Sequence, residues 1–169
     1  MPKAVYVASP LGFSAVGRLY HREVLLPAVK EAGLRAFDPW APKHARDSGL
    51  SSALKLPAGE ERIAQLSHAN HAAAELNFEL ISQADGLLAV VDGNDVDSGT
   101  AAEIGAASAM GKPIVGLRTD FRSMGDNDGS PINLQVEYFI RRTGGRLLSD
   151  PRTAARHLAK LIDRGAARR

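Results

Sequence analysis

Short apolar runs alternate along the chain with longer segments that repeat apolar residues at helical spacing. Three runs are apolar without interruption, as is typical of strands that are buried on both faces of a parallel sheet: 4–8, 86–91 and 113–117. Two weaker stretches, at 35–37 and 146–148, are further strand candidates. The pattern therefore predicts a buried sheet to which distant parts of the chain contribute.

The helical segments predicted between these strands are 15–32, 60–83, 99–110 and 151–164, with a further segment at 132–140. Pro27 predicts a kink or break in the first segment, and Gly33 predicts its end. The second segment carries an apolar face made of Ile63, Leu66, Ala69, Ala73, Leu76, Leu80 and Ile81.

The alternation of strands and helices predicts an α/β fold. We expect a doubly wound, mostly parallel sheet flanked by helices, of the Rossmann or flavodoxin-like kind, in a single domain that spans 1–169. In such sheets, ligands bind at the carboxyl ends of the strands, near the point where the strand order reverses.

Segment 38–59 is polar and contains three prolines, so we expect a long loop. Loops of this length are often lids or binding loops, and a disordered insertion is the alternative. Trp40 favours the functional interpretation, because an indole in a loop can stack on an aromatic ligand. A second polar loop is expected at 118–131, and the arginine-rich end, 165–169, is expected to be frayed.

The composition excludes several classes of protein. Of the 169 residues, 44% are hydrophobic and 24% are charged, which excludes wholesale disorder. The net charge of +2 is too small to indicate nucleic acid as a partner. With no cysteine, the chain has no disulfide, thiol nucleophile or cysteine-bound zinc. The apolar runs are too short for a signal peptide or a membrane span, so we expect a cytoplasmic protein.

Acidic residues cluster after the third predicted strand. Asp92, Asp95 and Asp97 precede a helix start, and Glu103 follows in what we expect to be about its first turn. Asp97 or Ser98 could cap the helix, and the helix dipole would keep Glu103 ionised at neutral pH. Capping and dipole compensation would explain Asp97 and Glu103 alone. The whole cluster, however, carries more negative charge than a cap needs.

A carboxylate at such a position suits attack on the anomeric carbon of a sugar. The transition state resembles an oxocarbenium ion, which negative charge stabilises, and a covalent glycosyl intermediate follows. The same carboxylates could instead hold Mg²⁺. No phosphate-binding lysine loop accompanies them in the sequence, which disfavours the metal, and the absence of a GxGxxG motif weighs against a dinucleotide. His68 and His71 have no third metal ligand nearby in sequence, and we interpret them as surface residues.

Four pieces of sequence together resemble the nucleoside 2-deoxyribosyltransferases, over roughly 4–140. They are Val5-Tyr6-Val7-Ala8 with Ser9-Pro10; Asn77 with Leu80-Ile81 and Ala84-Asp85-Gly86; Asp97-Ser98-Gly99-Thr100-Ala101-Ala102-Glu103-Ile104-Gly105; and Pro131-Ile132-Asn133-Leu134. The third piece, between a strand and a helix, is the specific one.

The resemblance implies a role for each matching residue. Glu103 would be the nucleophile that takes the 2-deoxyribosyl group, Tyr6 would orient it, and Asp97 would hold the base and help to protonate it. Asn133 would reach a neighbouring subunit's site, which implies a homo-oligomer. The remaining candidate substrate contacts are Asn77, Asp92, Gly99, Phe13, Asp38 and Trp40.

The resemblance also implies the partners, which would be a nucleoside and a free nucleobase, exchanged in nucleotide salvage. It implies no metal and no organic cofactor, and we expect neither nucleic acid nor a membrane as a partner.

Some features leave alternatives open. Asn77 stands where some members of the family carry aspartate and cannot act as an acid, and Gln135 stands where methionine is frequent. Each matching residue also has a structural interpretation: Tyr6 as a buried strand residue, Asn77 as a partner of backbone groups, and Asn133 as a helix start.

Two other functions compete with base exchange. One is hydrolysis of nucleosides or their 5′-monophosphates, for which Ser9, Ser14 and Arg18 could contact phosphate. The other is a nucleotide-sensing module without catalysis. An intact set of Tyr6, Asp97, Glu103 and Asn133 argues against the latter.

Overall fold

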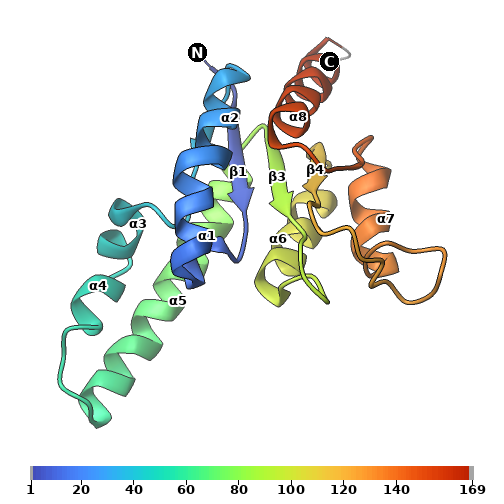
Figure 1. The fold of residues 1–169 in the computed structure, drawn as a ribbon. Helices are drawn as coiled ribbons and strands as arrows, with labels where there is room; N and C mark the ends of the chain where they lie inside the picture. The colour runs from blue at the N-terminus through green and yellow to red at the C-terminus, as the bar shows by residue number, and fades with distance from the viewer. Residues whose placement is uncertain (1, 168–169) are drawn as a thin grey trace.

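The computed structural model describes residues 2–167, and within them the chain forms a five-stranded parallel sheet in the order β2-β1-β3-β4-β5 (Figure 1). The strands are β1 (Ala4–Ala8), β2 (Arg35–Phe37), β3 (Gly86–Val90), β4 (Ile114–Leu117) and β5 (Leu147–Leu148). The chain passes from β1 outward to β2 and then returns to place β3 on the other side of β1. This reversal confirms the predicted doubly wound fold.

Helices cover both faces of the sheet (Figure 1). The α1 helix (Ala15–Tyr20), α2 (Leu26–Glu31) and α8 (Pro151–Ala166) pack on one face, and α5 (Glu60–Gln83), α6 (Ser98–Ala109) and α7 (Leu134–Arg142) pack on the other. In β1, the side chains of Val5 and Val7 belong to the first core and those of Tyr6 and Ala8 to the second. This alternation follows from the two-residue period of a strand.

The helix is interrupted near Pro27, as predicted, by a π-helical turn. This turn, His21–Leu25, separates α1 from α2, and the amide of Leu26 donates to the carbonyl of His21, five residues earlier. The wide turn relieves the helix at the position where Pro27 provides no donor. Gly33 then ends α2 with a φ of +77°, which glycine adopts without strain.

The expectation of a long irregular loop at 38–59 is wrong. The segment contains two short helices, α3 (Pro42–Asp47) and α4 (Leu50–Ala53). Pro42 occupies the first turn of α3, where its missing amide is not needed. Gly49, with a φ of +80°, joins the two helices. The polar composition of the segment reflects short helices with few buried residues.

The long α5 helix has the predicted bounds, but its apolar face is only partly covered. Ala69 and Ile81 are buried, whereas Ile63 near its start is 68% exposed. Figure 1 shows this end of α5 extending beyond the sheet, together with α4. The apolar series therefore continues past the core of this chain.

Helix α8 continues to Ala166, two residues beyond the predicted end at 164. Of the tail expected to be frayed, residues 168 and 169 lie outside the described part of the chain. Among residues 2–167, no helix combines the length and the apolar character that crossing a bilayer requires.

Candidate active site

A cavity of about 310 Å³ opens beside the carboxyl ends of β1 and β3, where the strand order reverses. Its walls come from the loop after β1, segment 38–59, α5 and the start of α6. The lining residues are Ser9, Phe13, Pro39, Trp40, His44, Ala45, Leu50, Ala73, Asn77, Asp97, Gly99, Thr100 and Glu103. This location agrees with the general rule for open α/β sheets.

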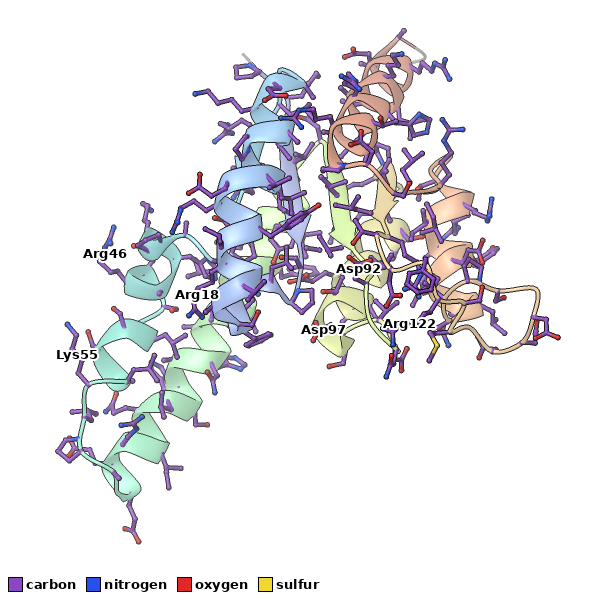
Figure 2. The ribbon with its side chains drawn as sticks, viewed as in Figure 1. Arg18, Arg46, Lys55, Asp92, Asp97 and Arg122 are labelled. Atoms are coloured by element: carbon purple, nitrogen blue, oxygen red, sulfur yellow. The ribbon has the colours of Figure 1, made fainter. Side chains whose placement is uncertain are left out.

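The start of α6 positions the two acidic residues of the cavity. Asp97 is the N-cap of α6. Its Oδ2 accepts two hydrogen bonds from Thr100, one from the backbone amide at 2.9 Å and one from the side-chain hydroxyl at 3.2 Å. Glu103 is the sixth residue of the helix and lies in its second turn. Figure 2 shows Asp92 and Asp97 on the loop that leads from β3 to α6.

The carboxylate of Glu103 is held by one hydrogen bond from the sheet. The hydroxyl of Tyr6, a fully buried residue of β1, donates to Oε1 of Glu103 at 2.6 Å. Burial raises the pKa of Glu103 to about 7, although the Tyr6 hydrogen bond lowers it, and the nearby charge of Asp97 raises it further. The sequence-based expectation of an ionised Glu103 rested on the helix dipole, which is felt mainly in the first turn, whereas burial acts in the opposite direction on its pKa.

Tyr6 is a hydrogen-bond donor at every physiological pH. Its pKa is raised far above the ordinary range, first by burial and then by the negative charge of Glu103. A hydroxyl that keeps its proton beside a carboxylate fixes the position of that carboxylate without neutralising it.

One buried polar atom in the cavity wall, Oγ of Ser9, has no hydrogen-bond partner in the described part of the chain. The side chain of Asn77 instead contributes a hydrogen bond to His44, which opposes the effect of burial on the pKa of that histidine. Ser9 is only 6% exposed, so its hydroxyl has little access to bulk water. Because an unpaired buried polar atom costs about 1–3 kcal/mol, such atoms favour a ligand that pairs with them.

Phe13 and Trp40 form an aromatic wall on one side of the cavity. Their ring centroids are 4.8 Å apart and the planes meet at 79°, an edge-to-face arrangement. Phe13 is 73% exposed, so its ring is open to a ligand. The sequence expectation that segment 38–59 contributes aromatic surface to the site agrees with this position of Trp40.

Three of the predicted contact residues do not line the cavity. Asp92 instead accepts hydrogen bonds from Thr119, including one from its hydroxyl at 2.6 Å, and so ties two loops together. Asn133 caps α7 by accepting from the amides of Gln135 and Val136. Asp38 lies behind the aromatic wall, where it accepts a hydrogen bond from the amide of Trp40.

Sequence reasoning missed His44, which lines the cavity from α3. Burial lowers the pKa of His44, and the charges of Asp47 and Asp38 partly oppose this shift. The signal available in the sequence was its place in a segment that already carried Trp40. Among residues 2–167, histidines and carboxylates form no group of three or more with the arrangement of a metal site.

The fold and the site define a class of protein: a doubly wound α/β domain with a desolvated carboxylate at its topological switch point. The model of the family described as "Nucleoside 2-deoxyribosyltransferase" matches residues 5–135. The chain belongs to this family, as the resemblance in the sequence indicated, and is an enzyme of the deoxyribosyltransferase type. No curated protein is similar enough to count as a match.

Solved structures share the fold at low sequence identity. A conserved protein from Enterococcus faecalis is 23% identical, with a TM-score of 0.62 over 98% of this chain and 99% of that one. A 2-deoxyribosyltransferase from Leishmania mexicana is 21% identical, with a TM-score of 0.61 over 94% and 98%. A 2-deoxyribosyltransferase from Bacillus psychrosaccharolyticus is 20% identical, with a TM-score of 0.53 over 90% of each chain.

The raised pKa of Glu103 predicts that this residue destabilises the folded protein. Its pKa is higher in the folded than in the unfolded state, so its ionisation lowers stability as pH rises towards and through about 7. Replacing Glu103 by Gln removes the charge and keeps an acceptor for Tyr6. We expect E103Q to raise the free energy of unfolding at pH 8 by about 1–3 kcal/mol, and by much less at pH 5.

Denaturant unfolding at both pH values measures this effect. Glu79→Gln, at an exposed position of α5, is the matched control and should change stability little at either pH. An E103Q variant that is no more stable than the wild type at pH 8 contradicts the assignment of a desolvated carboxylate.

Proposed function

We propose that the protein transfers the 2-deoxyribosyl group between nucleobases through a covalent ester with Glu103. The observation that carries this proposal is the carboxylate of Glu103 in the cavity, held through Oε1 by Tyr6. Because Oε1 is engaged, we assign the attack on the anomeric carbon to Oε2. The bond from this carbon to the leaving base breaks, and the negative carboxylate stabilises the oxocarbenium-like transition state.

In the second half of the reaction, a nitrogen of the incoming base attacks the same carbon. The ester bond breaks, its electron pair returns to Glu103, and a new nucleoside is formed. The two halves are chemically symmetric, so one cavity serves both the leaving and the entering base. Since the reaction reuses a free base, we propose a role in nucleotide salvage in the cytoplasm.

We assign the handling of the base and its proton to Asp97. The amide of Asn77 cannot donate an acidic proton, and Asp92 is committed to Thr119 outside the cavity. Asp97 lines the cavity and its Oδ2 is engaged by Thr100, so Oδ1 is the oxygen that we assign to the base. Asn77 and Gly99, which line the cavity, are proposed to contact the substrate beside it.

Hydrolysis of a 5′-monophosphate is the second candidate, and the phosphate contacts available to it are few. Of the three residues expected to hold phosphate, Ser14 caps α1 by accepting from Gly17, and Arg18 donates to the carbonyl of Gly12 at 2.9 Å. Ser9 alone presents an unpaired hydroxyl to the cavity. These commitments favour an uncharged nucleoside over a nucleotide.

We also propose that the enzyme works as a homo-oligomer. An apolar groove between α5 and α6 reaches Glu103 and is lined by Ala74, Phe78, Ile81, Ala102 and Ala106. Phe78 is 56% exposed, and contiguous exposed apolar surface often marks an interface. In this proposal, Asn133 keeps its role as the cap of α7 in its own chain and reaches the site of a neighbouring subunit.

A product assay tests the reaction. With deoxyinosine or thymidine as donor, we expect deoxyadenosine only when adenine is added, because the ester must be captured by a base. Glu103→Ala should abolish exchange and leave folding near normal. Release of free base without exchange, or turnover restricted to a deoxynucleoside 5′-monophosphate, would instead support the hydrolase.

The pH profile tests the roles of Tyr6 and Asp97. Because the nucleophile must be ionised, kcat/KM should rise with pH through about 7. Tyr6→Phe removes a hydrogen bond that lowers the pKa of Glu103, so the rise should move to higher pH. Asp97→Asn removes a charge that raises this pKa and retains a good N-cap, so the rise should move to lower pH. Shifts of the opposite sign would contradict this electrostatic account.

Mixing two inactive variants tests the shared site. Glu103→Ala lacks the nucleophile, and Asn133→Ala lacks the residue proposed to come from the neighbour. In a mixed oligomer, one kind of site recovers both residues, so activity should return after joint refolding. Light scattering measures the assembly. A monomeric wild type, or a mixture as inactive as its components, would contradict the proposal.

A further inference from the structure

A buried histidine outside the cavity is connected to the aromatic wall by two hydrogen bonds. His21 is 5% exposed, and its Nε2 lies 2.9 Å from Oδ1 of Asp38. The same oxygen accepts the backbone amide of Trp40, also at 2.9 Å. Neither His21 nor Asp38 lines the cavity, whereas Trp40 does.

The indole of Trp40 is fixed at its other end as well. Its Nε1 donates to the carbonyl of Ser9 at 2.9 Å. The ring lies so close to Gly12 that a Cβ there would be 1.9 Å from an indole carbon. Phe13 packs against it edge to face. The backbone amide, the ring nitrogen and the ring of Trp40 each have a contact within the protein. The position of the aromatic wall therefore depends on a small number of contacts.

The π-helical turn explains how His21 reaches Asp38. One extra residue in a turn rotates the helix that follows by about 100°. Leu25 and Val29 are thereby packed in the core between helix and sheet, while His21, where the wide turn begins, pairs with Asp38 at the end of β2. Pro27 accounts for the wide turn itself, and the pairing of His21 with Asp38 is a consequence of it.

We propose that His21 is a positioning residue that acts through Asp38 to hold Trp40 as the stacking surface for the nucleobase. This proposal rests on the proposed function in that it takes a nucleobase as the occupant of the cavity. His21 touches no substrate. It restrains the Asp38 carboxylate, which restrains the backbone of Trp40, and so fixes the distance across which a base is held.

The proposal predicts a division between binding and chemistry. Glu103 and its partner Tyr6 belong to α6 and β1, whereas the hydrogen bond of His21 goes to Asp38 after β2. Loss of the His21–Asp38 interaction should therefore raise KM for the acceptor base and leave kcat nearly unchanged. His21 is a better target than Asp38, because the charge of Asp38 also raises the pKa of Tyr6.

Trp40 is the one tryptophan in the sequence, so its fluorescence reports directly on the wall. In the substrate-free protein, His21→Phe should increase quenching of Trp40 by acrylamide. It should also raise KM for adenine about tenfold, as expected for the loss of a hydrogen bond to a charged group, with kcat within about twofold. His21→Gln can place a side-chain amide near the position of Nε2, and should restore both properties.

His157→Gln is the matched control. This histidine lies on α8 and is half-buried, with its Nε2 buried without a partner in the described part of the chain, so its replacement tests the general effect of changing a partly buried imidazole away from the cavity. Far-UV circular dichroism confirms that each variant is folded. His157→Gln should change neither the quenching of Trp40 nor KM.

Two results would overturn the proposal, and both differ from a failure of the proposed function. Unchanged quenching of Trp40 in folded His21→Phe shows that His21 does not hold the wall. Increased quenching with an unchanged KM shows that the wall does not hold the base. If the wild type exchanges no base, the affinity for adenine is measured instead of KM, from the quenching of Trp40 fluorescence by adenine. An affinity that is the same in the wild type and His21→Phe, or an absence of adenine binding, would overturn the inference.

Discussion

A half-buried carboxylate, partly desolvated at the edge of the sheet, is the constraint on which the rest of the site depends. Glu103 is buried enough for its pKa to reach about 7, and the single hydrogen bond from Tyr6 offsets only part of the cost. The packing of the surrounding core must therefore offset the rest of the free energy that desolvation of an ionised Glu103 costs. A poorly solvated carboxylate is a better partner for a developing positive charge than one that is already neutralised by an ion pair.

The strand order makes this arrangement possible. Tyr6 and Glu103 are 97 residues apart in sequence, and they meet because β3 returns to the side of β1 opposite β2. The two-residue period of β1 directs Tyr6 to the face that α6 covers, whereas Val5 and Val7 face the other core. A shift of register by one residue would remove the hydroxyl from the site, so the sheet determines the chemistry as well as the fold.

Local patterns in the sequence were enough to predict the buried strands, the bounds of α5 and the cap formed by Asp97, since these depend on neighbouring residues. They were not enough for features that depend on tertiary contacts. The helices α3 and α4 were missed because a polar segment with three prolines is typical of a loop. Asp92 was expected in the cavity, but it accepts a hydrogen bond from Thr119, which is 27 residues away in the sequence. The family resemblance identified Glu103, but its pKa depends on burial, and no single stretch of sequence reveals that.

Two sets of interactions meet at the cavity. The hydrogen bond from Tyr6 and the charge of Asp97 act on Glu103, and the hydrogen bonds of Asp38 connect His21 to the backbone of Trp40 in the aromatic wall. They are not fully independent, because the charge of Asp38 contributes to the raised pKa of Tyr6. In the proposed reaction, a change in the contacts of Trp40 that leaves this charge in place therefore alters which base is held, while Glu103 keeps its hydrogen bond to Tyr6 and its partly desolvated environment.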